Sequence, residues 1–173
     1  MTAKTMPLER CFTVADAGRR GVIGSVELQS ALQATGLPRI SRTLASSLVR
    51  MHDASGRAHL SYPEFEACHA FLQRTNAIFM KHDPQRAGSI NLQAVQLALL
   101  ELGFSLDMNP SGAFYKVCES FDASRQGVID QESFVTMAVQ LTNSKRMFEL
   151  FDEAKAGRVT LDFNQLVWIN AQL

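Results

Sequence analysis

Five twelve-residue segments of this chain share residue types that could bind a cation. They start at Asp16, Asp53, Asp83, Asp122 and Asp152. Carboxylate, amide and hydroxyl oxygens are the donors that hard cations such as Ca²⁺ prefer, so these segments raise the question of cation binding. Four of the five carry glycine at the sixth place, where a tight loop needs a positive φ, and the second has Ala58 there.

An aliphatic residue occupies the eighth place of every segment. These residues are Ile23, Leu60, Ile90, Ile129 and Val159. In a paired arrangement such a residue forms a short strand contact with its counterpart in a neighbouring loop and buries its side chain there. This feature is structural, and it does not depend on a metal.

Capping residues predict helices on both sides of the loops. Ser41 is placed to cap a helix whose Leu44 and Leu48 fall on one stripe, and Ser61 with Glu64 forms a capping box. The ninth place of the last four loops holds a good N-cap residue in each case: Ser61, Asn91, Asp130 and Thr160. The repeating unit is therefore helix–loop–helix.

The spacing of the loops predicts how these units pair. The second and third loops, and likewise the fourth and fifth, are separated by enough chain for only one continuous helix. Helices over Tyr62–Lys81 and about Gln131–Leu150 should each leave one loop and enter the next. The longer spacers have room for two helices and a turn. Loops one and two then pair, as do loops three and four, and the fifth has no partner in its own chain.

This loop, with Asp first, Gly sixth and an aliphatic eighth residue between helices, resembles the EF-hand, and five at this spacing resemble the penta-EF-hand family. The stretches LVRMHD and FELFD are also similar to that family. The resemblance implies an all-α fold in a single domain over residues 1–173, with loops at 16–27, 53–64, 83–94, 122–133 and 152–163. The family usually carries an N-terminal extension. Only a few residues precede the first expected helix here, so binding through an extension is not expected.

By the family pattern these loops are poor calcium sites. An EF-hand loop takes its oxygens from places 1, 3, 5, 9 and 12 and from the carbonyl at place 7. The third, fourth and fifth loops lack the twelfth-place carboxylate and have Ala94, Ser133 and Phe163 there. The candidate calcium ligands lie in the first two loops: Asp16, Glu27, Asp53, Ser55, Ser61 and Glu64. We expect calcium binding to be weak or absent.

An arginine stands at the fifth place of both candidate loops, as Arg20 and Arg57. Each removes an oxygen ligand and brings a positive charge close to where Ca²⁺ would lie, a repulsion of several kcal/mol at an effective dielectric constant near ~20. The other role open to these arginines is to pair with the remaining acids and hold the loops in a metal-free form.

Charge and composition exclude several classes of function. The chain has 17 Lys+Arg against 17 Asp+Glu, so it offers no basic field for nucleic acid or an anionic membrane. Its apolar runs are much shorter than the roughly 20 residues of a membrane span, and no signal segment is recognisable. Three cysteines without CxxC spacing suggest neither a disulfide framework nor a zinc site. We expect a cytoplasmic protein.

The resemblance implies a regulatory role. No GxSxG, HExxH or phosphate-binding glycine loop is present in the sequence, so enzyme activity is not expected. The leading hypothesis is an adaptor that binds a partner peptide and dimerises through the fifth hand, over Val159 to Leu173, as a homo- or heterodimer. The expected dimer residues are Val159, Phe163, Leu166, Val167, Trp168 and Ile169. The alternatives are the regulatory small subunit of a calpain-type cysteine protease and a calcium sensor or buffer.

Overall fold

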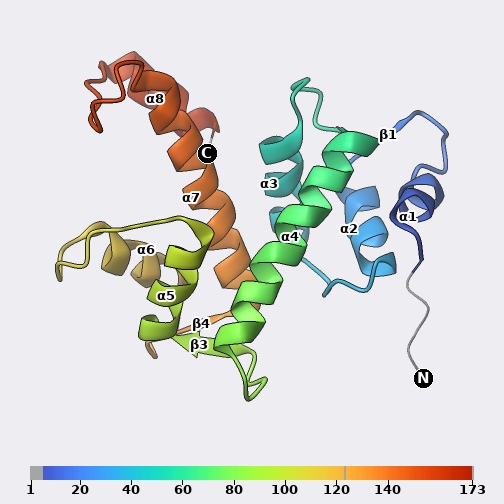
Figure 1. Ribbon diagram of the computed structural model, residues 1–173. Coiled ribbons are helices and arrows are strands. Elements are labelled where there is room, and N and C mark those ends of the chain that lie inside the picture. Colours follow the sequence, from blue (N-terminus) through green and yellow to red (C-terminus); the bar gives the residue numbers. More distant parts are fainter. Residues whose placement is uncertain (1–5, 123, 173) are drawn as a thin grey trace. The chain divides into compact units, whose positions relative to one another are not determined.

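The computed structural model describes residues 6–122 and 124–172, so Leu173 lies outside the described residues. The chain divides into two compact units, Met1–Ala87 and Gly88–Leu173. The boundary between the units falls inside the third twelve-residue loop. Helices dominate both units, and each unit contains one small antiparallel strand pair (Figure 1).

The first unit is built around the strand pair that joins its two loops. Its elements in chain order are α1 (Leu8–Ala15), β1 (Val22–Ile23), α2 (Ser25–Ala34), α3 (Arg42–His52), β2 (Leu60–Ser61) and α4 (Tyr62–His82). Ile23 of β1 lies opposite Leu60 of β2, and both side chains are fully buried. Beside them Phe12 of α1 packs against Phe65 of α4, with ring centroids 5.6 Å apart. The two loops thereby share one apolar core.

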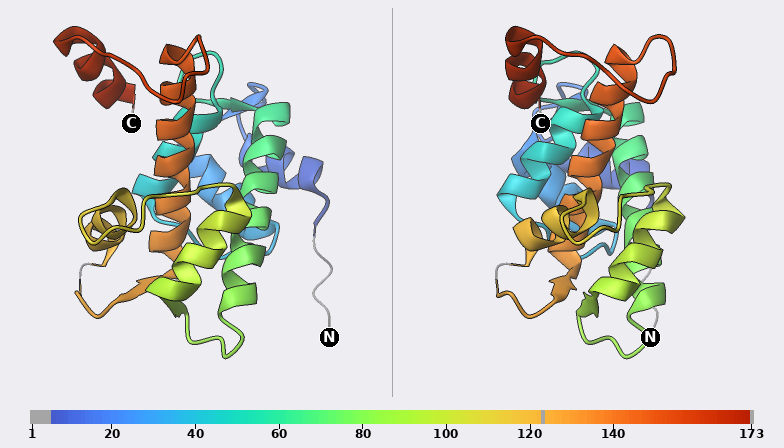
Figure 2. Two further views of the ribbon diagram at one scale, coloured as in Figure 1. Left: turned by 60° about the vertical axis from the view of Figure 1, so that its left-hand side comes forward. Right: turned by 90° about the vertical axis from the view of Figure 1, so that its left-hand side faces the viewer.

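The second unit repeats this plan once. Its elements are β3 (Ser89–Asn91), α5 (Leu92–Leu102), α6 (Ala113–Phe121), β4 (Val128–Asp130), α7 (Gln131–Phe151) and α8 (Phe163–Gln172). Ile90 of β3 lies opposite Ile129 of β4, again with both side chains buried. Figure 2 shows α7 running from β4 to the loop that precedes α8.

The long helices α4 and α7 confirm the prediction drawn from the loop spacing. Each is a single helix that leaves one loop and enters the next, and each ends one residue later than expected. Ser41 also caps α3 as predicted, since its hydroxyl accepts a hydrogen bond from the Leu44 amide at 3.1 Å. Asn91 and Asp130 cap α5 and α7 in the same way.

The prediction for the fifth loop was wrong at its helix start. Thr160 was expected to cap the last helix, but α8 begins at Phe163. Asp162 is the capping residue: its carboxylate accepts from the Gln165 amide at 2.9 Å, and the Gln165 side chain accepts from the Asp162 amide. Residues 158–160 form no strand, unlike their counterparts in the other loops. Without a strand to fix the ninth place, the reciprocal Asp162–Gln165 pair sets the start of the helix.

A glycine ends α5 and turns the chain toward α6. Gly103 has a φ of +93°, which only glycine adopts readily, and the next amide, of Phe104, donates to the Leu99 carbonyl at 2.9 Å. Farther along, Gly112 lies so close to the backbone that a Cβ there would be 2.6 Å from the Asp107 carbonyl oxygen. The segment between α5 and α6 therefore has a defined shape.

Truncating one of the paired strand residues should destabilise the protein far more than truncating an exposed leucine. Leu60→Ala should lower the free energy of unfolding by about 2–5 kcal/mol, because the lost side chain is fully buried. The matched control is Leu97→Ala on α5, where the side chain is 54% exposed and a change below about 0.5 kcal/mol is expected. Urea denaturation measures both, and similar losses would contradict the assigned core.

Candidate metal-binding loops

The first-place aspartate closes each loop by accepting hydrogen bonds from backbone amides farther along it. Its carboxylate accepts from the sixth-place amide in four loops: from Gly21 at 2.7 Å, Ala58 at 2.6 Å, Gly127 at 2.7 Å and Gly157 at 2.8 Å. In the third loop the fifth-place amide of Ala87 donates to Asp83 at 2.8 Å. A carboxylate with two such bonds keeps lone pairs for other partners, so this role does not exclude metal binding.

The second loop keeps its turn although it lacks the sixth-place glycine. Ala58 has a φ of +58°, a left-handed conformation that costs roughly 1–2 kcal/mol for a residue with a Cβ. Its amide still reaches Asp53. The aspartate and the strand pair together hold the loop in a conformation that the residue at this place does not favour.

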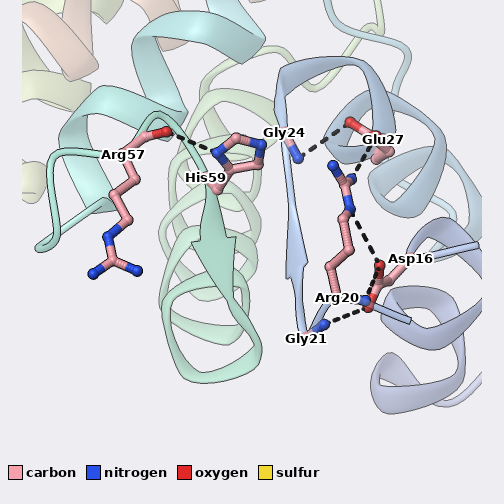
Figure 3. A network of polar contacts seen from close by, with 7 residues as sticks. All are labelled: Asp16, Arg20, Gly21, Gly24, Glu27, Arg57 and His59. Atoms are coloured by element: carbon pink, nitrogen blue, oxygen red, sulfur yellow. Dashed lines mark hydrogen bonds and ion pairs between the residues drawn. The ribbon is translucent and has the colours of Figure 1, made fainter. Parts of the chain in front are cut away.

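In the first loop Arg20 lies between the two candidate calcium ligands (Figure 3). Its Nη2 donates to Glu27 Oε1 at 3.0 Å, and its Nε lies 3.9 Å from Asp16 Oδ1. The other carboxylate oxygen of Glu27 accepts from the Gly24 amide at 3.1 Å. Both acids that the family pattern assigns to the ion are thus engaged with a positive charge from the loop itself. With only two side chains left to donate oxygen, the first loop does not fit calcium.

The alternative role of the two fifth-place arginines, pairing with the loop acids, is found for Arg20 and not for Arg57. Among the described residues the Arg57 guanidinium forms no ion pair, and in Figure 3 its side chain extends away from the network around Arg20. Its carbonyl oxygen instead lies 2.7 Å from Nδ1 of His59. Glu64, the acid at the twelfth place of this loop, accepts hydrogen bonds from Ala54 and Ser61 instead.

Glu64 closes the second loop through uncharged donors. Its Oε1 accepts from the Ala54 amide at 2.9 Å, and its Oε2 accepts from the amide and the hydroxyl of Ser61 at 2.8 and 2.7 Å. Ser55 donates its hydroxyl to Asp53 at 2.7 Å. The four candidate ligands of this loop form two hydrogen-bonded pairs, Ser61 with Glu64 and Ser55 with Asp53, and among the described residues no cationic side chain forms an ion pair with them. Of the two candidate loops, the second has the donor set that fits a cation better.

The remaining loops lack an acid at the place where the exiting helix would contact an ion. In the fourth loop Ser133 stands there, and both its amide and its hydroxyl donate to the ninth-place Asp130, at 2.9 and 2.7 Å. Asp130 is thereby used to cap α7. Ala94 and Phe163 stand at the corresponding places of the third and fifth loops. Nowhere in residues 6–122 and 124–172 do three or more His, Cys, Asp or Glu side chains gather as a metal-binding group.

Hydrogen bonds to the loop acids shift their pKa values downward. The Ser61 hydroxyl is the main cause of the lowered pKa of Glu64, and the Ser55 hydroxyl is the main cause for Asp53. The pKa of Glu27 is lowered chiefly by its own backbone amide, with smaller contributions from Gly24 and Arg20. All three acids are stabilised in the charged form without any metal.

The cysteines are buried free thiols, as the sequence suggested. Burial raises the pKa of Cys68 to about 12 and, together with the nearby Asp122, raises that of Cys118 to about 11. Such thiols are almost wholly protonated at neutral pH and are poor nucleophiles.

An apolar groove in the second unit was not found from the sequence. It measures about 570 Å³ and is lined by Gly103, Phe104, Ser105, Leu106, Leu141, Ser144, Lys145 and Phe148. The spacing of Leu141, Lys145 and Phe148 along α7 places them on one face of the helix, and this spacing can be recognised in the sequence. Nothing in the sequence alone indicates that the segment after α5 lies against that face.

Helix–loop–helix units joined by short strand pairs make this chain an EF-hand protein. No protein-family model matches it. The chain is 26% identical over 162 residues to peflin from Mus musculus and 26% identical over 164 residues to penta-EF hand domain-containing protein 2 from Dictyostelium discoideum. It is also 28% identical over 153 residues to the calpain-2 catalytic subunit of Oryctolagus cuniculus. These relatives are penta-EF-hand proteins, and this chain resembles them over most of its length.

Coverage differs among these relatives. The matches span 92%, 95% and 84% of this chain, and they cover 58% of mouse peflin, 77% of the Dictyostelium protein and 35% of the calpain subunit. The chain thus spans little more than half the length of the peflin sequence. A solved structure of a homolog of programmed cell death 6 protein from Leishmania major Friedlin has the same fold, with a TM-score of 0.69 at 24% identity over 96% of this chain and 90% of that one. Across the described residues, no helix combines the length and apolarity needed to cross a bilayer.

The lowered pKa values of the loop acids predict a loss of stability in acid. The folded protein holds these groups charged at pH values where the unfolded chain has begun to take up protons. Their stabilisation is therefore complete above the unfolded pKa values and is lost as pH falls through the folded ones. We expect the melting temperature to fall between about pH 5 and pH 3, and less steeply in Glu64→Gln.

The control for this measurement is Glu66→Gln on the same helix, where the side chain is exposed. That variant should follow the wild-type pH profile in a series of thermal melts. If Glu64→Gln shows the same acid slope as wild type, the hydrogen bonds around Glu64 do not contribute as described.

Proposed function

We propose that this protein is a non-enzymatic adaptor or regulatory protein of the cytoplasm that dimerises through its fifth EF-hand and binds a partner peptide. Calcium binding is weak or lost, and where it persists the second loop, with Asp53, Ser55, Ser61 and Glu64, is the better site. The chain has no net charge to attract nucleic acid. The observation that carries the proposal is the apolar surface of α8.

Four large apolar side chains of α8 face solvent. Phe163, Leu166, Val167 and Trp168 are between 45% and 76% exposed. Ile169 is half-buried on the same helix. An exposed apolar surface of this kind marks an interaction site in a monomeric chain. The fifth loop also has no paired strand, because residues 158–160 form no strand.

A second copy of the chain could cover the apolar surface of α8 and also pair with the unpaired segment of the fifth loop. Two Val159 segments related by a two-fold axis can form the antiparallel pair that the other four loops have. The same axis brings the apolar surface of one α8 against that of its partner. A heterodimer would use the same surface with a different EF-hand chain.

Charged residues on this surface should give monomers. Val159→Asp with Trp168→Glu introduces desolvated charges at the proposed interface, so light scattering coupled to size exclusion should show half the wild-type mass. The matched control is Val14→Glu on α1, a 64% exposed apolar residue of the first unit that is not among the proposed dimer residues, which should remain dimeric. An unchanged dimer in the double variant would overturn the proposal.

The partner peptide is proposed to occupy the apolar groove between α7 and the segment after α5. Phe104, Leu106, Leu141 and Phe148 supply apolar walls, and Lys145 is the cation among the lining residues. Such a groove suits an apolar segment that carries an acidic group. None of the groove residues belongs to a candidate calcium loop, so the groove is formed without metal.

Partner binding should therefore be largely independent of calcium. A sensor EF-hand couples metal to partner binding through the twelfth-place carboxylate, and only Glu27 and Glu64 hold that place. We expect Glu27→Gln with Glu64→Gln to leave partner affinity within about a factor of five, a coupling near 1 kcal/mol. Capture of the partner in calcium and in chelator tests this, and Phe104→Glu serves as the loss-of-binding control. Strictly calcium-dependent capture, abolished by the double variant, would contradict it.

The match to a calpain-2 catalytic subunit favours a second candidate, the regulatory subunit of a calpain-type cysteine protease. In that case α8 would pair with the protease chain. Sedimentation of an equimolar mixture with a calpain catalytic subunit separates the two candidates, because only the second predicts a heterodimer with that protease chain. A calcium buffer is less favoured, since three of the five loops lack the acid at place 12.

A further inference from the structure

Arg20 contacts the two acids with which an EF-hand loop would bind its ion. The acids at places 1 and 12 approach a bound cation from opposite sides of the loop. Here Asp16 ends α1 and Glu27 lies in the first turn of α2, and the guanidinium contacts both. The positive charge that draws the two ends of the first hand together is thus part of the chain.

One glycine lies where a side chain would interfere with this arrangement. A Cβ on Gly24 would be 3.0 Å from Glu27 Oε2, tight enough to disturb the hydrogen bond from the Gly24 amide. A Cβ on Gly18 would be 3.5 Å from the stem of Arg20, which is an ordinary van der Waals contact. These are the ninth and third places, which would otherwise hold calcium ligands. At the ninth place, the glycine that removes a ligand also leaves room for the Glu27 carboxylate that Arg20 contacts.

The second loop is an internal comparison, because Arg57 stands at the same fifth place. Its guanidinium forms no ion pair among the described residues, and Glu64 is held by Ala54 and Ser61 instead. An arginine at this place does not by itself bridge the loop. The bridge in the first loop depends on the particular arrangement of Asp16, Arg20 and Glu27.

We propose that the Arg20 guanidinium is the permanent cation of the first EF-hand and clamps the end of α1 to the start of α2, so that this hand is closed to calcium. The inference goes beyond the proposed adaptor function, because it concerns the first loop alone. It does not depend on a dimer or on a partner.

The geometry indicates how the clamp responds to its surroundings. In a sensor EF-hand, an ion would move the exiting helix by binding the carboxylate at the place of Glu27. Here Arg20 donates a hydrogen bond of 3.0 Å to that carboxylate. Asp16 is only 6% exposed, whereas the side chains of Arg20 and Glu27 are 48% and 35% exposed. Salt therefore weakens the outer part of the clamp while the Asp16 end remains shielded.

The first test restores ligands with and without the arginine. All variants carry Glu64→Gln, which silences the second loop, and calcium alone is the titrant in calorimetry. Gly18→Asp with Arg20→Asp supplies acids at places 1, 3, 5 and 12 and should bind calcium with a dissociation constant at or below about 10⁻⁴ M. Gly18→Asp alone, with Arg20 kept, should bind at least tenfold more weakly.

Three results would overturn the proposal in this test. One is equal binding by the single and double variants, including failure of both to bind, because Arg20 would then not be what excludes the ion. Another is calcium binding by the protein with native Gly18 and Arg20 that is lost on Glu27→Gln. The third is a gain of calcium binding in the double variant that persists after Glu27→Gln, because the ion would then lie outside the first loop.

The second test measures the clamp without metal. Arg20→Met keeps the apolar stem and removes the charge, so it should lower the melting temperature by about 2–4 °C at low salt. This difference should shrink toward zero in about 1 M NaCl, where the screening length is near 3 Å. Arg57→Met is the matched control and should melt like wild type at both salt concentrations. Indistinguishable behaviour of the two methionine variants would overturn the clamp.

Discussion

The first-place carboxylate is the interaction on which each loop depends. By accepting amide hydrogen bonds from the fifth and sixth places, it forces the chain to reverse within a few residues. That reversal carries the eighth-place residue into position to pair in four of the loops. The helix that follows can then start at the tenth place. The first-place acid closes the turn without a metal, and in the first four loops the strand pair and the helix start build on that turn.

This arrangement explains why the other ligand places vary so widely. Once the loop is closed by its own aspartate, oxygen at the third, fifth or twelfth place is not needed for folding. Arg20, Ala94 and Phe163 can therefore stand where ligands would be. The first two loops retain acids at both ends, yet they use them differently: Glu27 meets a guanidinium, and Glu64 meets amides and a hydroxyl.

Periodicity and capping predicted the helices well, because those signals are local. The extents of α4 and α7 followed from loop spacing, and the cap at Ser41 followed from one residue type. Side-chain direction was not predictable from the sequence. Arg20 donates to Glu27, whereas Glu64 accepts from Ala54 and Ser61 and not from Arg57. The start of α8 was also missed, since Asp162 and Gln165 act as a cap only when no strand fixes the preceding residues.

The boundary between the two units crosses the third loop beside an exposed arginine with a left-handed backbone conformation. Arg86 is exposed, has a φ of +54° and stands one residue before the last position of the first unit. A trypsin-like protease that recognises arginine in exposed loop tips would cut here. The fragments would each contain an intact strand pair, so the cut would separate two units that each keep their own paired strands.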